Sequence, residues 1–275
     1  MVAISKARQE TQLPIGTDGG FSRFEGDPDF VLSLARGLRV IETFEGHTEG
    51  RTVADVARQT GLSRAAVRRS LLTLQMLGYA EANGSSYRLT TRAFRLGFAY
   101  LSSTSLAALA QPTLERVTEA VHESSSLSVL EGYEIVYIAR SASKRVMSVN
   151  LSVGSRLPAY CTSMGRILLS AMPDEKLVDY LNQLEIKAST PKTITDKNVL
   201  REILVRVRTD RFAVTDEELE LGLRSIAVPV QARNGGVVAA MNIGVHASRV
   251  SAAEMIHRFL PVLRENAQAL GQVLA

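Results

Sequence analysis

The stretch from Arg51 to Leu89 reads RTVADVARQTGLSRAAVRRSLLTLQMLGYAEANGSSYRL. Apolar residues recur at helical spacing on both sides of Gly61, and a pattern typical of a β-hairpin follows directly. Two short helices joined by a tight turn and followed by a hairpin form a winged helix-turn-helix. This stretch therefore predicts a compact domain of the kind that places a helix in the major groove of DNA.

Each predicted helix has a local start signal. Thr52 and Ser63 stand just before the two periodic runs, where a side-chain hydroxyl can accept a hydrogen bond from a helix N–H group. In the second helix Val67, Leu71 and Leu74 fall on one stripe, which we expect to face the first helix. The opposite side of that helix is then available to DNA.

That opposite side carries cations near its N-terminal end. Arginine there can donate two hydrogen bonds to guanine, and a small residue lets the backbone approach the groove. Hydroxyl and guanidinium donors in the hairpin suit phosphate oxygens, which position a protein without reading base sequence. The predicted DNA-contacting residues are Thr52, Ser63, Arg64, Ala65, Arg68, Arg69, Ser85, Ser86 and Arg88.

The alternative is that these arginines belong to an ordinary solvated helix face. The caps, the turn, the apolar stripe and the hairpin agree with one another, which favours DNA binding. Overall charge gives little help, because 32 Lys plus Arg against 28 Asp plus Glu leave a net charge of only +4. The cations are concentrated locally, since Glu81 is the single acidic residue between Ser63 and Arg92.

With 275 residues, the chain is long enough for a second domain with its own core. We expect a flexible tail over residues 1–29, a winged helix-turn-helix domain over 30–90, a connector helix over 91–104 and a second domain over 105–275. Phe94 and Phe98 are too apolar for a solvated linker. The connector is therefore expected to bury a face against the same helix of a second chain, forming a homodimer.

The second domain mixes helical and strand patterns. Expected strands are two arms of a hairpin within residues 126–138, and segments 146–153, 212–215, 225–231 and 237–245. Expected helices cover residues 106–122, begin near residues 162, 174 and 196, and close the chain after residue 251. Helices before, inside and after a mainly antiparallel sheet define an α+β domain, similar in outline to the GAF and PAS group.

The residues that carry enzyme chemistry form no recognisable motif. Cys161 is the only thiol, and the four histidines show no metal-ligand spacing, so neither a zinc site nor a local Cys–His pair is visible. We expect no catalytic residue, no metal and no cofactor, with an enzyme that uses Cys161 as the rival hypothesis. A single cysteine and the lack of a membrane-length apolar run or signal core favour a soluble, cytoplasmic protein.

Three further segments resemble IclR-family transcriptional regulators: LARGL at 34–38, LPAYCTSMGR at 157–166 and DEELELGLRSIA at 216–227. The similarity extends from Phe30 to Ala275. Within the family, HESSS at 122–126 and CTSMGR at 161–166 most resemble the branch that controls β-ketoadipate pathway genes. The resemblance implies an effector-binding second domain and a palindromic double-stranded operator DNA.

The resemblance also implies an effector of the protocatechuate, 4-hydroxybenzoate or β-ketoadipate class, which alters operator binding or polymerase recruitment. A regulator of another small-acid pathway is the alternative. Homodimer and dimer of dimers are both open, as are activation and repression. Contact with RNA polymerase is open too, and no membrane partner is expected.

Effector-binding positions follow from the same resemblance. The family positions that face the ligand match Ser163, Met164, Gly165, Thr215, Leu223, Ser225, Asn242 and Gly244. An acid-binding pattern known in the family has Asp at the position of Thr215 and Ser at those of Asn242 and Gly244. The departure implies that the ligand differs from that of the glyoxylate regulators.

Two arginines in the second domain are candidate carboxylate ligands. Arg140 and Arg156 are expected to clamp a carboxylate, because guanidinium groups bind carboxylates in a bidentate manner. A surface ion pair is the alternative for an arginine in a hairpin. For Met164 the alternative is an ordinary core position.

Overall fold

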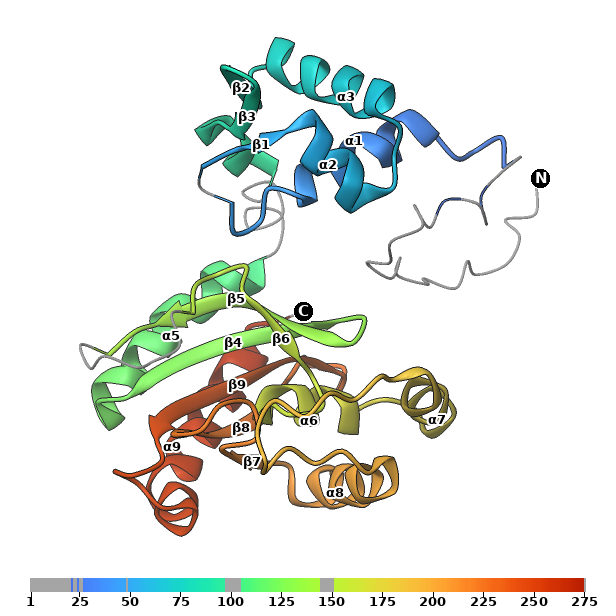
Figure 1. The fold of residues 1–275 in the computed structure, drawn as a ribbon. Coiled ribbons are helices and arrows are strands. Elements are labelled where there is room, and N and C mark those ends of the chain that lie inside the picture. The colour runs from blue at the N-terminus through green and yellow to red at the C-terminus, as the bar shows by residue number, and fades with distance from the viewer. Residues whose placement is uncertain are drawn as a thin grey trace, which may run out of the picture. The chain divides into compact units, whose positions relative to one another are not determined.

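The computed structural model describes residues 21, 24, 27–47, 49–96, 105–143 and 151–274. The chain divides into two compact units, Met1–Tyr100 and Leu101–Ala275, which are described separately below (Figure 1). Most of the expected flexible tail, residues 1–29, lies outside the described residues.

The first unit contains a winged helix-turn-helix, as predicted. Its elements are α1 (Leu32–Glu42), β1 (Arg51–Thr52), α2 (Val53–Thr60), α3 (Arg64–Met76), β2 (Ala80–Asn83) and β3 (Ser86–Leu89). The three strands form one sheet in the order β1-β3-β2. Val67 and Leu71 of α3 are fully buried, and Leu74 nearly so, in a core shared with α1 and α2, which confirms the predicted apolar stripe.

Side-chain caps fix where α2 and α3 begin. The Thr52 hydroxyl accepts from the Asp55 amide, and the Asp55 carboxylate accepts in return from the Thr52 amide and hydroxyl, a capping box. These hydrogen bonds from Thr52 lower the pKa of Asp55. The Ser63 hydroxyl accepts from the Ala66 amide in the same way. Gly61 ends α2 with φ of 70°, a left-handed conformation that glycine adopts without a Cβ clash.

The predicted connector helix is described only at its beginning. A 3-10 turn covers Thr91–Ala93, residues 94–96 are helical, and residues 97–104 lie outside the described part of the chain, Phe98 among them. Phe94 is 77% exposed. The expected dimer contact through this segment therefore stays a prediction.

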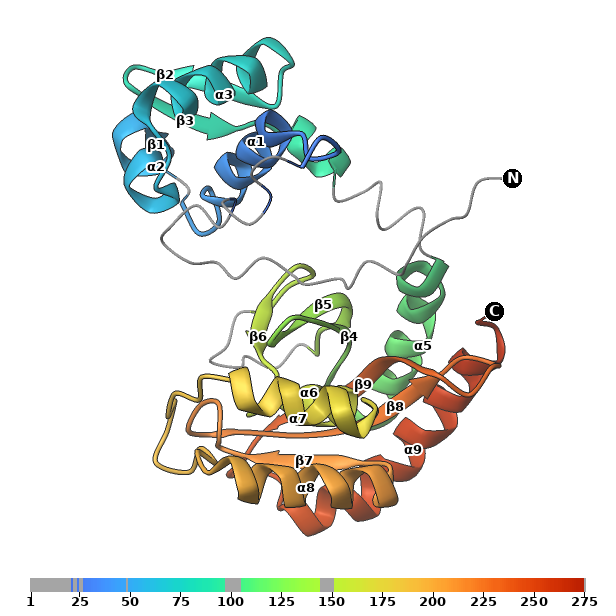
Figure 2. The same ribbon diagram turned by 90° about the vertical axis from the view of Figure 1, so that its right-hand side faces the viewer.

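The second unit is an α+β domain built on a six-stranded antiparallel sheet, which confirms the predicted class (Figure 2). The strands are β4 (Ser124–Glu131), β5 (Glu134–Ser141), β6 (Arg156–Pro158), β7 (Ala213–Asp216), β8 (Leu223–Gln231) and β9 (Val237–His246). Their order in the sheet is β6-β5-β4-β9-β8-β7. The expected strand over 146–153 is not seen in residues 151–153, which form a loop, while residues 146–150 lie outside the described chain.

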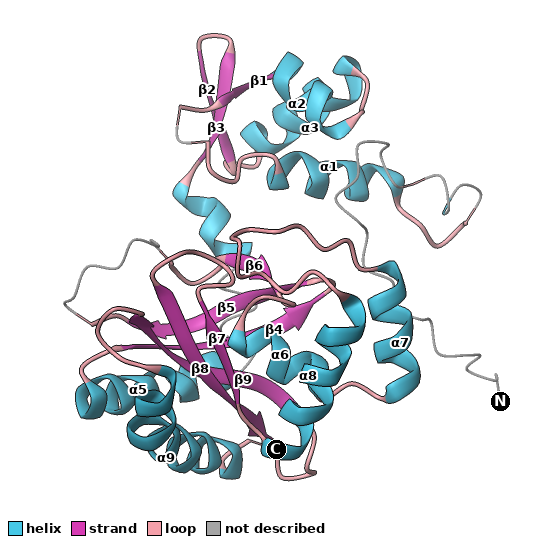
Figure 3. Ribbon diagram, turned by 60° about the horizontal axis from the view of Figure 1, so that its bottom comes forward, coloured by secondary structure: helices cyan, strands magenta, loops and turns pink. Residues whose placement is uncertain are grey.

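Helices cover both faces of this sheet (Figure 3). On one face lie α5 (Ser105–Val121) and α9 (Ala252–Gln272), and on the other lie α6 (Ser163–Ser170), α7 (Asp174–Gln183) and α8 (Lys197–Asp210). Each face has its own apolar core, one centred on Leu114 and Phe259 and the other on Met164 and Leu204. The face of the sheet under α6 also contains small and polar residues, which leave space for a cavity.

Candidate functional site

The recognition surface of the first unit is the outer side of α3. Arg64, Ala65, Arg68 and Arg69 are all exposed there. None of the three arginines forms an ion pair with any residue that the structure describes. Their guanidinium groups are therefore available to an anion from outside the protein, as the predicted DNA contact requires.

In the wing, which is the β2–β3 hairpin, two of the three predicted DNA contacts already form hydrogen bonds within the protein. Ser85 is exposed, but the Ser86 hydroxyl donates to the Asn83 carbonyl within the turn. Arg88 donates to Glu81 on the paired strand at 2.5 Å, with both side chains about half exposed. An exposed pair of this kind is weak and can be exchanged for a phosphate, so Arg88 stays a predicted contact that must first leave Glu81.

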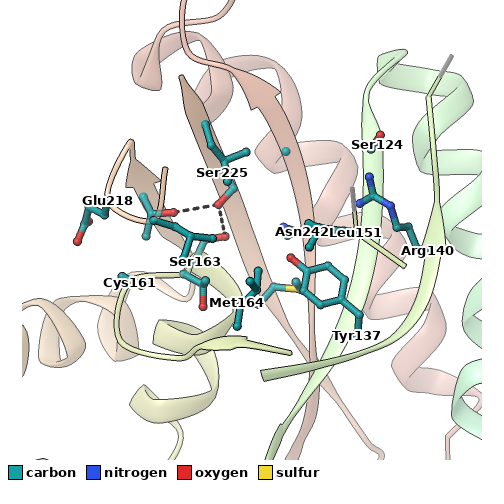
Figure 4. A pocket seen from close by; sticks show the side chains of 16 residues that line it. Ser124, Tyr137, Arg140, Leu151, Cys161, Ser163, Met164, Glu218, Ser225 and Asn242 are labelled. Carbon is teal, nitrogen blue, oxygen red and sulfur yellow. Dashed lines mark hydrogen bonds between the residues drawn. The ribbon is translucent and has the colours of Figure 1, made fainter. Parts of the chain in front are cut away.

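A partly enclosed cavity of about 30 Å³ lies between the sheet and the start of α6 in the second unit. That volume accommodates roughly one or two water molecules. Its lining comes from all six strands of the sheet, α6 and the loops beside them (Figure 4). Eight predicted effector residues line it: Arg140, Ser163, Met164, Thr215, Leu223, Ser225, Asn242 and Gly244.

Strand register brings these residues together from distant parts of the sequence. One row across the strands is Thr215, Ser225, Gly244 and Ser124, and the next is Ala227, Asn242, Ser126 and Arg140. Residues directly opposite each other in antiparallel strands have neighbouring side chains on one face. Because these rows contain glycine, alanine and serine, the sheet surface beneath α6 stays open enough for a cavity.

A β-bulge directs Arg140 to this face. Ser128 pairs with Tyr137 while the preceding Leu127 pairs with Ala139, so Ile138 is an extra residue in β5. An extra residue reverses which face the following side chains occupy. As a result both Tyr137 and Arg140 line the cavity, although strict alternation would separate them. Ile138 itself packs in the core beneath α5.

Three buried hydroxyls form a chain at the α6 end of the cavity. The Ser225 hydroxyl lies 2.8 Å from that of Ser163 and 2.9 Å from that of Thr215. Figure 4 shows Ser163 and Ser225 on one side of Met164 and Tyr137, and Arg140 on the other. The cavity thus has polar groups at both ends, with Met164, Tyr137 and Asn242 between them.

Arg140 and Asn242 both carry unused hydrogen-bonding capacity. Arg140 is half-buried, burial lowers its pKa, and its one hydrogen bond to a described residue goes to the Ser126 hydroxyl at 3.0 Å. Asn242 is 7% exposed, and its Oδ1 has no hydrogen-bond partner among the described residues. A buried polar group without a partner is costly, so both side chains are suited to bind a polar ligand.

Two predicted effector residues are placed elsewhere. Arg156 does not line the cavity, because its guanidinium donates to Glu134 and Glu131, both at 2.8 Å. The expected two-arginine clamp therefore reduces to Arg140. Gly165 lies behind the lining, where a Cβ would come within 2.1 Å of the Ala159 carbonyl oxygen. Its part in the site is to let α6 approach that loop.

A buried ion pair beside the cavity connects α6 to the loop that follows β7. Arg166 donates to Glu218 at 2.6 Å and to the Tyr160 carbonyl, and the Ile194 amide also donates to Glu218. The two side chains of the pair are 3% and 9% exposed.

Burial, together with the nearby Glu218 charge, raises the pKa of the Cys161 thiol to about 12. Cys161 is therefore a neutral thiol rather than an activated nucleophile.

Several lining residues were not predicted from the sequence: Ser124, Tyr137, Leu151, Leu157, Cys161, Thr162, Glu218 and Leu219. Glu218 stands in one of the segments that resemble the family, but it is not among the predicted effector positions. Tyr137 could have been found by pairing β4 with β5 and allowing for the bulge. Burial raises the pKa of Tyr137 to about 12, so its hydroxyl is protonated at neutral pH.

Over the described residues, no group of His, Cys, Asp and Glu side chains has an arrangement that suits a metal ion. Among the same residues, none of the helices combines the length and apolarity needed to cross a membrane.

A winged helix-turn-helix unit joined in one chain to an α+β unit whose pocket has polar groups at both ends defines a DNA-binding regulator that responds to a small ligand. Comparison with known proteins gives the family. The model of the IclR C-terminal domain of bacterial transcriptional regulators matches residues 98–272, and that of the IclR helix-turn-helix domain matches residues 33–84. The chain belongs to the IclR family.

Three proteins that are similar to this chain indicate its branch of the family. The Pca regulon regulatory protein of Pseudomonas putida is 51% identical over 87% of this chain and 83% of its own length. The inducer-binding domain of the PobR transcription factor from Acinetobacter, solved as a double mutant with 3-hydroxybenzoic acid, is 34% identical, with a TM-score of 0.59 over 61% of this chain and 98% of that one. An IclR homolog from Microbacterium hydrocarbonoxydans, complexed with 4-hydroxybenzoate, is 27% identical, with a TM-score of 0.75 over 87% and 97%.

Proposed function

We propose that this protein is a cytoplasmic, effector-responsive regulator that binds operator DNA and controls genes of aromatic-acid catabolism of the β-ketoadipate type. The observation that carries the proposal is Arg140, a half-buried cation at a partly enclosed cavity with only a serine as partner among the described residues. The names of the Pseudomonas and Acinetobacter relatives support the pathway.

The DNA-binding part of the proposal rests on α3. Arg64, Arg68 and Arg69 contact base edges or phosphates in the major groove, while Thr52 and Ser63 bring two helix N-termini to the backbone. The exposed side chains of Phe94 and Leu96 pack in a homodimer contact, so that two first units read a palindromic site. Pairing of these dimers into a tetramer is compatible with the same arrangement.

The effector part of the proposal assigns the two ends of the cavity. Arg140 binds the carboxylate of the acid, because a guanidinium makes charge-assisted hydrogen bonds to it. The hydroxyls of Ser163, Thr215 and Ser225 bind oxygen atoms at the far end, Asn242 binds one between the two ends, and Leu223 and Gly244 shape the wall. An aromatic or dicarboxylic acid is larger than the cavity, so walls must move, and Met164 has the flexible side chain to do so.

The proposed mechanism is linkage between the two units. An acid that binds one conformation of the dimer more tightly shifts the population toward it and changes the affinity for the operator, or the recruitment of RNA polymerase. The sign of regulation follows from where the operator lies relative to the promoter.

A thermal-shift panel on the full-length protein tests the effector assignment. We expect protocatechuate, 4-hydroxybenzoate or β-ketoadipate to raise the melting temperature, because a ligand that binds only the folded state stabilises it by mass action. Glyoxylate and cis,cis-muconate serve as comparison acids. No shift with any acid, at concentrations up to solubility, would contradict the proposal.

We also propose that the protein is not an enzyme. The rival hypothesis needs a reactive Cys161, whereas this thiol is fully buried and its pKa is raised to about 12 by that burial. Hydrolysis of an aromatic ester that disappears in Cys161→Ala would overturn the proposal.

A further inference from the structure

The helix that follows the segment between the two units, α5, is attached to the strands of the cavity by hydroxyl groups. Most of its contact with the sheet is apolar, formed by residues such as Leu114 and Val117. Within that contact the buried Ser125 hydroxyl donates to the Leu114 carbonyl at 2.8 Å. Apolar contacts tolerate small sliding, whereas a hydrogen bond fixes one register.

Thr118 adds a second attachment one turn along the helix. Its hydroxyl lies 3.0 Å from the Ser125 hydroxyl on β4 and 3.3 Å from the Ser141 carbonyl on β5. Ser125 and Ser141 are direct partners across the two strands. One threonine therefore connects α5 to both strands at the same level of the sheet.

These attachment points lie directly behind the cavity. In β4, Ser124 lines the cavity and Ser126 holds the Arg140 guanidinium, while Ser125 between them faces α5. In β5, Ser141 follows Arg140 immediately. An anion that draws the Arg140 side chain toward itself pulls on Ser126, the hydrogen-bond partner of Arg140. It also pulls on Ser141, the next residue of β5.

We infer that Thr118 is a positioning residue that couples the cavity to α5, and through α5 to the DNA-binding unit that precedes it in the chain. The inference rests on the proposed effector site. Thr118 and Ser125 neither line the cavity nor belong to the DNA-binding unit, and their hydroxyls transmit a displacement of the β4–β5 ends to the helix. Loss of the contact leaves both binding sites intact but makes them independent.

Matched variants on α5 separate coupling from folding. Thr118→Val removes the hydroxyl at nearly constant volume, Thr118→Ser retains it, and Ser125→Ala removes its partner. Thr113→Val is the control, because Thr113 is a threonine of the same helix, more buried than Thr118, whose hydroxyl accepts from Arg116 of α5 and not from a residue of the sheet. Only variants whose melting temperature stays near that of the wild type enter the comparison, and Thr118→Ser keeps the test interpretable if the valine variant is unstable.

The measurement is the DNA dissociation constant with and without saturating acid. Full-length protein is titrated by fluorescence anisotropy against a duplex that it enriches from a random-sequence pool, with 4-hydroxybenzoate, protocatechuate or β-ketoadipate as probe, and acid binding is measured separately by calorimetry. We expect roughly a tenfold or larger change of DNA affinity in the wild type, Thr118→Ser and Thr113→Val. Thr118→Val and Ser125→Ala should reduce it to within about twofold of unity, with acid binding unchanged.

The outcomes separate the two proposals. If the acid binds Thr118→Val and still changes its DNA affinity as much as in the wild type, the coupling role is overturned and the proposed function stands. If calorimetry finds no binding of any acid to the wild type, the proposed function fails, and the coupling role fails with it.

Discussion

The arginines on the outer side of α3 and two arginines that are paired with carboxylates in the second unit are used in opposite ways. On α3, Arg64, Arg68 and Arg69 are exposed and form no ion pair with a described residue. In the second unit Arg166 is buried against Glu218, and Arg249 makes a two-pronged contact with the buried Glu123. A cation left without an internal partner is available to an external anion, whereas a buried and paired one stabilises the fold.

Arg140 breaks this pattern within its own unit. It is half-buried, yet its partner among the described residues is a neutral serine and not a carboxylate. By the comparison with α3, we expect its partner to be an anion from outside the chain. The same criterion separates it from Arg156, which has two carboxylate partners.

The largest expected effect comes from breaking the buried pair. Arg166→Met leaves the Glu218 carboxylate buried without its cation, which should lower the free energy of unfolding by about 3–5 kcal/mol. Urea denaturation of the full-length protein measures it. Arg258→Ala, which breaks an exposed pair with Glu254, is the control and should cost less than about 1 kcal/mol. Equal losses in both variants would show that burial does not distinguish the two pairs.

The next effect tests the free arginines of α3. Arg68→Ala and Arg69→Ala should each weaken DNA binding by roughly tenfold to a hundredfold, with unfolding unchanged, because these side chains stabilise no internal contact. Anisotropy titrations at several salt concentrations measure both the affinity and its salt slope. Arg206→Ala, an equally exposed arginine on α8, should leave both unchanged. DNA affinity that is unaffected by either α3 variant would show that α3 is merely a solvated face.

Arg140→Gln should weaken effector binding and leave the stability of the protein unchanged. Removing a charge-assisted contact should weaken acid binding about tenfold or more, while thermal stability without the acid stays near that of the wild type. Calorimetric titration with the acid that gives the largest thermal shift measures it, and Arg156→Gln is the matched control. A larger loss in Arg156→Gln than in Arg140→Gln would reverse the assignment.

The structural features that could be predicted from the sequence are those that depend on residues close together in the chain. Thr52 and Ser63 cap α2 and α3 as expected, because a cap and its helix lie within three residues of each other. The apolar stripe of α3 and the antiparallel character of the second sheet followed from periodicity. The two-residue strand β1 was not foreseen, since its strand character comes only from pairing with β3.

Parts of the site that depend on distant residues could not be predicted in this way. Arg140 and Arg156 look alike in sequence, and only the strand register gives one of them carboxylate partners. The bulge at Ile138 has no local signature, yet it decides which side chains of β5 face the cavity. Arg166 and Glu218 are separated by 52 residues and meet through the packing of α6 against the β7–β8 connection.

The smallest expected effect concerns the wing. Glu81→Gln removes the anion that holds Arg88 and should strengthen DNA binding by about two- to threefold, with a slightly steeper salt dependence, because exposed pairs are worth under about 1 kcal/mol. Anisotropy at low and moderate salt measures it. Glu81→Gln in an Arg88→Ala background is the control and should show no such gain. Weaker binding in Glu81→Gln would mean that the pair orients Arg88 for DNA instead of competing with it.

The hydroxyl chain of Ser163, Ser225 and Thr215 has a consequence for the range of ligands. Three hydroxyl hydrogens serve two hydrogen bonds, so one hydrogen is spare, and reversing the direction of the chain moves it from Thr215 to Ser163. Either end can thus donate to a carboxylate oxygen or accept from a phenol without any heavy atom moving. Once the walls have moved to admit an acid, we expect acids that differ in the group they present at this end to need only a reorientation of these protons there.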